Sequence, residues 1–381
     1  MNNIKFTILL FIIINPVCSY SQNVFVDQSL EQNIELFQLE EPLNLWLNFL
    51  KSEEDKIGSK YWNKAEIEQF SDSTYFQMSD LDYFELGNIV KTLNYGTTVL
   101  SITKSDSLFK ITSKFEYRIN DSSSITPFIF HVYAKKEKIS DELKLYNPFP
   151  INKKLHLQEL TFKNITYVFP ENHKFNKTLA KKQYRIIHKV EKDFDLRLEN
   201  SLYIFSSDRT SSYQIRGYDF HFQNIGIEFP SGNADVENNT VYSYGCDEYF
   251  PHEVIHLMIN PKWPNAHGWL IEGFATYFGG SRGKTLDWHL EKLNIYLLKN
   301  PELDLNNLLE LINMDDITGF RYVLGGLFIK MAYEKGGAED VKQLLSFGNS
   351  NEEFYLALET VLGIKKDSLN KYIRTNLNKS L

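Results

Sequence analysis

The sequence predicts an α+β protein in which a strand-rich part is followed by a mainly helical part. Up to about residue 245, several segments alternate or cluster β-branched and aromatic residues, as strands do, and from 247 onward helical spacing of apolar residues dominates. The composition agrees, because 22 Tyr and 28 Phe among 381 residues are typical of sheets with large side chains. This length favours two or three folding units over one.

Residues 23–150 are predicted to form an α+β accessory domain whose role the sequence does not indicate. A helix is expected over residues 41–54, where Leu43, Trp46, Leu47 and Leu50 recur at helical spacing. Strands are expected over 97–103, 108–117 and 127–135, with polar turns such as 120–124 between them.

Residues 157–381 are predicted to form a second domain with a sheet part, 157–245, and a helical part, 247–381. The expected order is a strand at 165–169, a helix at 176–194, and strands at 201–205, 219–229 and 240–244. We interpret the last three strands as a sheet that ends directly before the chemical motif described below.

The N-terminus is typical of a secretory signal peptide. Lys5 precedes the apolar run Phe6 to Ile14, and small residues follow Asn15-Pro16. We therefore expect residues 1–21 to be removed and the chain to be exported to the periplasm, the cell surface or the medium. The run is shorter than the roughly 20 residues of a membrane span, so no span is expected in the mature chain. The alternatives are an uncleaved anchor or a lipid at Cys18.

The charge distribution argues against a nucleic-acid-binding protein, and the cysteine content argues against a fold held by disulfides. The formal net charge is −8, and no Lys/Arg block with interleaved aromatics is present, so nucleic acid is not an expected partner. Without the signal, Cys246 is the single cysteine, and no intrachain disulfide can form. It is interpreted as a small buried residue rather than a metal ligand or nucleophile.

The segment His252-Glu253-Val254-Ile255-His256 is an HExxH motif. On a helix, two His four residues apart lie one turn apart on one face, so both imidazoles can approach a single Zn²⁺. Glu253 lies about 100° around the axis, beside the ion, where it can act as general base. Asp247 is the expected N-cap of this helix, and Pro251 is expected in its first turn.

A catalytic zinc site needs a third protein ligand, and Glu272 is the candidate. It lies in the apolar segment 268–277, where a buried carboxylate is costly unless it meets a cation. Gly279-Gly280 is expected to end this second helix. A loop at 260–267 would make the two helices antiparallel and bring His256 and Glu272 together.

These two motifs resemble the gluzincin metallopeptidases, the peptidase MA-like superfamily of thermolysin and aminopeptidase N. The resemblance covers residues 157–345. It implies a mixed sheet subdomain whose edge strand flanks the substrate, followed by a mainly helical subdomain that carries HExxH. It also implies one Zn²⁺ held by His252, His256 and Glu272, with Glu253 as the base.

The same resemblance implies a tyrosine that donates a hydrogen bond to the oxyanion of the tetrahedral intermediate. Tyr322, flanked by Gly319 and Gly325-Gly326, is the candidate, and Tyr333 and Tyr277 are the alternatives. Thr276, one turn after Glu272, is a candidate partner for a ligand imidazole.

The chain also departs from the family pattern. The interval from His256 to Glu272 is a few residues shorter than in aminopeptidase N, and 234–238 only faintly echoes the strand that binds a substrate α-amine there. Glu237 is interpreted as a solvated strand residue, so endopeptidase and exopeptidase activity both stay open. His267 and His289 are not expected to be ligands.

The sequence therefore predicts an exported zinc metallopeptidase. Its substrates are expected to be peptides or proteins, because an edge strand can pair with an extended backbone. Two alternatives remain: a catalytically slow or silent metal-containing binding or envelope protein whose accessory domain carries the role, and a structural envelope protein. The sequence does not indicate the cleavage preference or the oligomeric state.

Overall fold

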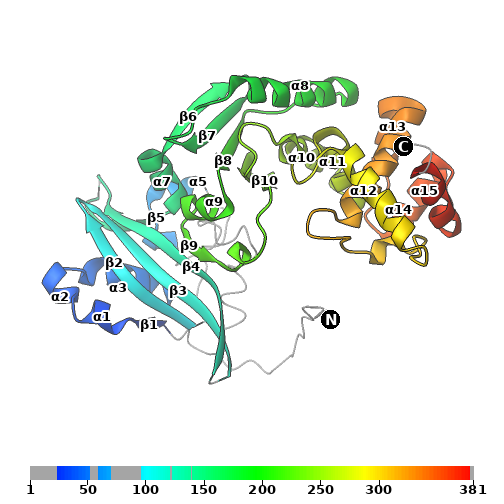
Figure 1. Ribbon diagram of the computed structural model, residues 1–381. Helices are drawn as coiled ribbons and strands as arrows, with labels where there is room; N and C mark the ends of the chain where they lie inside the picture. Colours follow the sequence, from blue (N-terminus) through cyan, green and yellow to red (C-terminus); the bar gives the residue numbers. More distant parts are fainter. Residues whose placement is uncertain (1–23, 52–58, 70–95, 121, 139, 378–381) are drawn as a thin grey trace. The chain divides into compact units, whose positions relative to one another are not determined.

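The computed structural model describes residues 24–51, 59–69, 96–120, 122–138 and 140–377 (Figure 1). The predicted signal peptide, including Cys18, lies outside these residues, as does the end of the helix expected at 41–54. The described residues form two compact units. The first contains residues up to 127 and 133–146, and the second contains 128–132 and everything from 147 onward. The sequence had suggested a division between 150 and 157.

The first unit is built on a sheet with the strand order β1-β2-β3-β4-β5. β1 is parallel to β2, whereas the pairs β2–β3 and β4–β5 are antiparallel. The strands are β1 (Val24–Val26), β2 (Gly96–Ser105), β3 (Leu108–Asn120), β4 (Ser123–Lys136) and β5 (Leu143–Tyr146). All three strands predicted here are confirmed, each slightly longer than expected.

Helix α3 (Glu40–Leu50) supplies much of the core of the first unit, as its apolar spacing predicted. Trp46 and Phe49 are fully buried and stack with ring centroids 5.3 Å apart. Trp46 Nε1 donates a hydrogen bond of 2.8 Å to Ser113 Oγ on β3, which satisfies the one polar group of the indole. The unit also contains α1 (Gln28–Glu31), α2 (Ile34–Phe37), the 3₁₀ turn Ser59–Tyr61 and α5 (Lys64–Gln69).

The second unit contains a five-stranded sheet with the order β10-β11-β8-β7-β6. β8 is parallel to both β7 and β11, and the outer pairs are antiparallel. The strands are β6 (Leu157–Phe162), β7 (Ile165–Pro170), β8 (Ser201–Ser206), β10 (Ser231–Asp235) and β11 (Thr240–Tyr244). Helix α8 (Lys177–Phe194), predicted at 176–194 and capped by Asn176, buries its apolar stripe in the same core.

The strand predicted at 219–229 is wrong. Only Tyr218–His221 (β9) forms a strand, which pairs with Phe128–Phe130 of β4 rather than with β8 or β11, and a 3₁₀ turn at Phe222–Asn224 follows it. The rest is a loop because Arg209, at the start of α9 (Arg209–Ile215), binds its backbone: the guanidinium donates to the carbonyls of Gln223 and Ile227. Carbonyls bound in this way are not available to a sheet, and β10 is the edge strand.

The described residues after β11 form helices, as predicted, with no strand beyond two isolated bridges. The N-cap prediction for the first of them is wrong. Phe250, not Asp247, precedes α10, and its backbone N–H donates to Gln183 Oε1 at 2.7 Å. One helix, α7 (Pro148–His156), precedes the sheet of this unit. The main helices after the sheet are α10 (Pro251–Lys262), α11 (Gly268–Gly279), α12 (Leu286–Lys299), α13 (Phe320–Leu345), α14 (Asn351–Ala357) and α15 (Leu369–Leu377).

Helices α11 and α13 pack unusually closely through two glycines. A Cβ atom on Gly273 would lie 2.2 Å from the carbonyl carbon of Gly325, and one on Gly325 would lie 2.1 Å from the carbonyl oxygen of Trp269. Any side chain at either position would push the helices apart. The close contact places Glu272, next to Gly273, and Tyr322, one turn before Gly325, near the start of α10.

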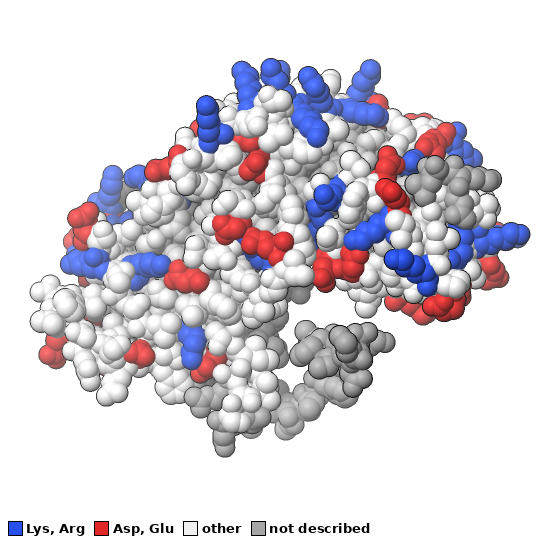
Figure 2. Space-filling model, in the orientation of Figure 1, with Lys and Arg blue, Asp and Glu red and all other residues white. Residues whose placement is uncertain are grey.

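The surface gives two further facts about the described part of the chain. None of its helices has both the length and the apolar character that a membrane crossing requires. On the face shown in Figure 2, acidic and basic side chains are mixed, except along α8 at the upper edge, where basic side chains gather. The exposed basic residues of α8 are Lys177, Lys181, Lys182, Arg185, Lys189 and Lys192.

The glycine contact predicts that alanine destabilises the protein at one glycine of α11 and not at another. We expect Gly273→Ala to lower the free energy of unfolding by about 1 to 3 kcal/mol, because the new methyl group meets rigid backbone. Gly268→Ala, in the first turn of the same helix with no atom within 4 Å of the new Cβ, should leave it unchanged or raise it by up to about 1 kcal/mol. Urea denaturation measures both, and equal effects would contradict the close-contact argument.

Candidate metal centre

His252 and His256 lie one turn apart on α10, as their spacing predicted, and both are buried. Pro251 occupies the first position of the helix, where its missing N–H costs no hydrogen bond. The two Nε2 atoms are 3.3 Å apart. The helix therefore presents two imidazole nitrogens to one point in space.

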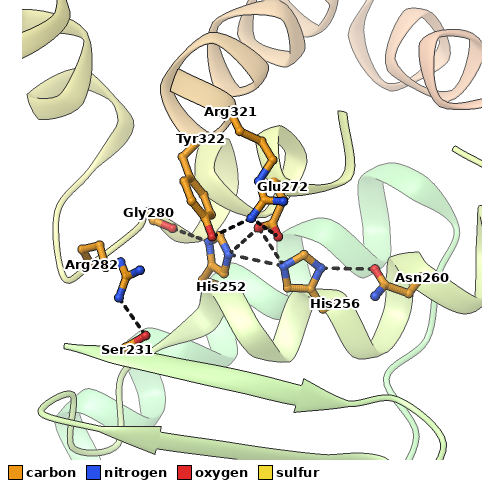
Figure 3. Close-up of polar contacts among 9 residues, drawn as sticks. All are labelled: Ser231, His252, His256, Asn260, Glu272, Gly280, Arg282, Arg321 and Tyr322. Atoms are coloured by element: carbon orange, nitrogen blue, oxygen red, sulfur yellow. Dashed lines mark hydrogen bonds and ion pairs between the residues drawn. The ribbon is translucent and has the colours of Figure 1, made fainter. Parts of the chain in front are cut away.

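Glu272 on α11 brings a carboxylate to the same point (Figure 3). Its Oε2 atom lies 3.3 Å from His252 Nε2 and 3.5 Å from His256 Nε2. Among the described residues, these three are the one group of His, Cys, Asp and Glu whose possible ligand atoms converge within 4.8 Å. The structure thus brings together the three side chains that the sequence selected.

Both imidazoles are oriented through their other nitrogen. His252 Nδ1 lies 2.6 Å from the carbonyl oxygen of Gly280, which can only accept, so Nδ1 carries the proton and Nε2 keeps a free lone pair. His256 Nδ1 lies 3.2 Å from Asn260 Oδ1, one turn further along α10. Thr276, the predicted partner, is buried but bonds neither ring, and that prediction is wrong.

The distances fit a shared metal ion better than direct hydrogen bonds. A tetrahedral Zn²⁺ that holds N and O ligands at about 2.0 to 2.1 Å separates neighbouring ligand atoms by about 3.3 to 3.4 Å. The observed separations are 3.3, 3.3 and 3.5 Å. A charge-assisted hydrogen bond between imidazolium and carboxylate would instead be about 2.7 to 2.9 Å long. The residues therefore fit a tetrahedral ion.

Glu272 and His256 shift each other's pKa in opposite directions. Burial alone would raise the pKa of Glu272, but the adjoining imidazoles of His252 and His256 hold it well below its usual range. Burial would lower the pKa of His256, but Glu272 and, to a smaller extent, Glu253 raise it. The pair thus keeps the carboxylate charged and attracts positive charge.

Glu253 lies beside the three converging residues without joining them. Its half-buried side chain is packed against the edge strand β10, where a Cβ atom on Gly232 would come within 2.7 Å of Glu253 Cγ. Glycine at this position therefore leaves room for the carboxylate. This is the location expected for a base that acts next to the ion rather than on it.

Tyr322, in the first turn of α13, faces the imidazole of His252 with ring centroids 6.0 Å apart. Burial, followed by the charge of Glu272, raises its pKa, so the hydroxyl stays protonated and can donate. Arg321 Nη2 donates a 3.1 Å hydrogen bond to Tyr322 Oη and lies 3.5 Å from Glu272 Oε1 (Figure 3). One guanidinium thus links the two helices at the site.

The alternative tyrosines have other partners. Tyr333 Oη donates to Asp193 Oδ2 at 2.6 Å and accepts from Lys189 Nζ at 2.7 Å, and Tyr277 packs against Tyr333. These hydrogen bonds hold the hydroxyl of Tyr333, on α13, against α8 and away from the converging side chains. Tyr322 is the tyrosine of the three that faces a candidate ligand.

The remaining candidates lie apart from the ligand atoms or are unreactive. His267 caps α11 through Trp269 N, and the buried His289 binds Thr318 and the carbonyl of Ser281. Glu237 is exposed in the turn between β10 and β11, not in a strand. Burial, then Glu253 and Asp247, raises the pKa of Cys246 to about 12, so its thiol stays protonated.

Sequence reasoning missed the residues that orient the site. Asn260 follows His256 by one helical turn, a spacing that could have identified it. Arg321 and the Gly280 carbonyl carried no such signal, because their contacts form only when α11, α13 and α10 pack together.

No family model matches the chain, and no curated protein does. Among solved structures, 18 chains match. A mutant of an M1 zinc metallopeptidase from Deinococcus radiodurans is 12% identical, with a TM-score of 0.29. A two-domain M1 zinc metallopeptidase mutant bound to L-tryptophan is also 12% identical, with a TM-score of 0.31. In both cases the match covers 74% of this chain and 64% of the other. The activity and the ligand named for these two proteins belong to them and are not assigned to this chain by the match.

The contact between Asn260 and His256 predicts weaker metal binding without the amide. We expect Asn260→Ala to lower the affinity for Zn²⁺ about 10- to 100-fold, because the imidazole loses the partner that fixes its orientation. Competition with a chromophoric chelator measures this affinity. Asn265→Ala, an exposed position in the following loop, is the control. Equal affinities of the two variants would show that Asn260 does not orient the ligand.

Proposed function

We propose that this chain is a zinc-dependent peptidase that hydrolyses peptide bonds in peptides or proteins. One observation carries the proposal: the Nε2 atoms of His252 and His256 and the Oε2 atom of Glu272 form a triangle with sides of 3.3 to 3.5 Å, matching the edges of a tetrahedral coordination sphere. Two imidazoles and one carboxylate suit Zn²⁺ and leave one of its four positions for water or substrate. When bound, zinc would supply Lewis acidity, lowering the pKa of a water molecule and polarising a carbonyl group.

Glu253 is proposed as the general base and acid. Its carboxylate would accept a proton from the attacking water and then deliver it to the leaving amine nitrogen. Its place between the converging ligands and β10 supports this role, because a base must lie within hydrogen-bonding reach of both water and substrate. The space left by Gly232 allows the carboxylate to approach the edge strand.

Tyr322 is proposed to donate its hydroxyl proton in a hydrogen bond to the oxyanion of the tetrahedral intermediate. The hydroxyl oxygen already accepts from Arg321, so its own proton is free to point elsewhere. Arg321 is proposed as a positioning residue that holds both Tyr322 and the outer oxygen of Glu272.

Peptides are the proposed substrates because β10 is an edge strand beside Glu253. Within the described residues, β10 pairs with β11 alone, so its other edge can bind an extended backbone by strand addition. Export is also part of what we propose, and it rests on the N-terminal pattern of Lys5 and the apolar run after it.

The role of Glu253 is tested by Glu253→Gln. We expect the variant to bind one Zn²⁺ with unchanged affinity while kcat for cleavage of a peptide library falls by about 10²- to 10⁴-fold, since the amide cannot accept the proton. Mass spectrometry of cleavage products and metal analysis measure the two effects. Glu237→Gln, in an exposed turn, should cleave like the wild type. Wild-type turnover by Glu253→Gln would refute the mechanism, and a protein that binds zinc without cleaving any peptide would favour a binding role.

Tyr322→Phe tests oxyanion stabilisation separately. We expect kcat to fall by about 10²- to 10³-fold with little change in KM, because the lost hydrogen bond forms only in the transition state. Steady-state kinetics on one cleaved peptide provide the measurement. Tyr333→Phe removes a hydroxyl from the contact with Asp193 and should leave kcat unchanged. A Tyr322→Phe variant with normal kcat would exclude Tyr322 from catalysis.

A further inference from the structure

The turn that follows α11 holds an arginine in a backbone conformation that arginine seldom adopts. Ser281 and Lys284 are joined by backbone hydrogen bonds of 2.8 and 2.9 Å, and the two residues between them, Arg282 and Gly283, have φ of +51° and +72°. Two consecutive positive φ angles are typical of type I′ turns, which favour Asn, Asp or Gly. A residue kept at such a position against its preference is a candidate for function.

The side chain of Arg282 reaches toward the edge strand. Its Nη1 atom donates a 3.0 Å hydrogen bond to Ser231 Oγ at the start of β10 (Figure 3). Its guanidinium lies 4.2 Å from the centre of the Phe229 ring. The turn begins directly after Gly280, whose carbonyl orients His252. Arg282 is thus held beside both the candidate metal centre and the proposed path of the substrate.

The charge of Arg282 is not balanced within the described residues. The side chain is half-buried, yet no carboxylate lies within 4.0 Å of its guanidinium. Arg321, close by, is paired with Glu272. A partly desolvated guanidinium without an acid is unfavourable, and its planar donors match a carboxylate well. The geometry therefore leaves Arg282 able to bind an incoming anion.

Arg282 and Tyr322 line the same pocket, whose volume is about 460 Å³. Ile227 and Phe229 give it an apolar wall. Asp315 and Asp316 also line it. Asp315 is paired with Lys292 at 2.6 Å and accepts from the N–H groups of Ile317 and Thr318, so its charge is largely compensated. Asp316 is exposed and is the carboxylate that would repel an anion here.

We propose that this pocket is a substrate subsite in which Arg282 binds a carboxylate of the peptide next to the scissile bond. The inference rests on the proposed peptidase function and adds a preference to it. The carboxylate belongs to an Asp or Glu side chain or to the C-terminus of the substrate, since the two present the same group to a guanidinium.

Binding without cleavage tests the preference apart from catalysis. In the Glu253→Gln background loaded with zinc, calorimetry compares short peptides that differ only in a free or amidated C-terminus, and amidated peptides that differ only in Glu or Gln at one position. We expect one of these carboxylates to tighten binding about 10-fold or more. The arm that shows the effect identifies the source of the carboxylate.

Substitutions then assign the preference to Arg282. Arg282→Asn suits the positive φ, so the turn should stay folded and the melting temperature should not fall. In the same background, this variant should lose the carboxylate preference. Lys284→Gln removes one positive charge from the same turn and should keep the preference, and Asp316→Asn should increase it about twofold. A preference that is absent from the first comparison, or that survives Arg282→Asn, would overturn the inference.

The outcome separates this inference from the proposed function. If the zinc-loaded wild type cleaves peptides with no preference for carboxylates, the peptidase proposal stands and the subsite is wrong. If no peptide is cleaved but the carboxylate preference depends on Arg282, the pocket is retained as a carboxylate-binding site and the peptidase proposal fails.

Discussion

The candidate site depends on the close packing of α11 against α13. Glu272 directly precedes Gly273, and Tyr322 lies one turn before Gly325, so the contact between the two glycines also sets where the carboxylate and the phenol lie. Metal geometry tolerates little error, because ligand distances vary by only about 0.2 Å around their usual values. A single methyl group between the helices would shift Glu272 by more than that. The close packing of the two helices and the positions of Glu272 and Tyr322 therefore depend on the same two glycines.

The polar groups around the site all serve to direct lone pairs toward one point. His252 uses its Nδ1 proton on a carbonyl, so its Nε2 lone pair must face His256 and Glu272. Arg321 binds the outer oxygen of Glu272 and leaves the inner one for the same point. Three converging lone pairs repel one another unless positive charge lies among them. As packing of unprotonated side chains this arrangement is unfavourable, and a bound cation would relieve the repulsion.

The parts of the site that sequence could predict are those governed by local geometry. The helical period alone places His252, Glu253 and His256, and the cost of burying a carboxylate in an apolar helix distinguishes Glu272. The predicted α+β class is confirmed for the same reason, since alternation and helical spacing are local signals. The strand expected at 219–229 is wrong because Arg209 binds the backbone of that segment, a contact between residues distant along the chain.

The same reasoning explains why the turn after α11 could not be recognised from sequence. The pattern Gly280-Ser281-Arg282-Gly283 indicates a turn, but only the folded chain brings the Gly280 carbonyl to His252 and the Arg282 guanidinium to Ser231. Gly280, directly before the turn, and Arg282, inside it, therefore contact a candidate metal ligand and the edge strand, respectively. The turn is closed by its own backbone hydrogen bonds between Ser281 and Lys284. Because only Ser281 separates Gly280 from Arg282, one short segment determines both the orientation of the His252 imidazole and the position of the guanidinium beside β10.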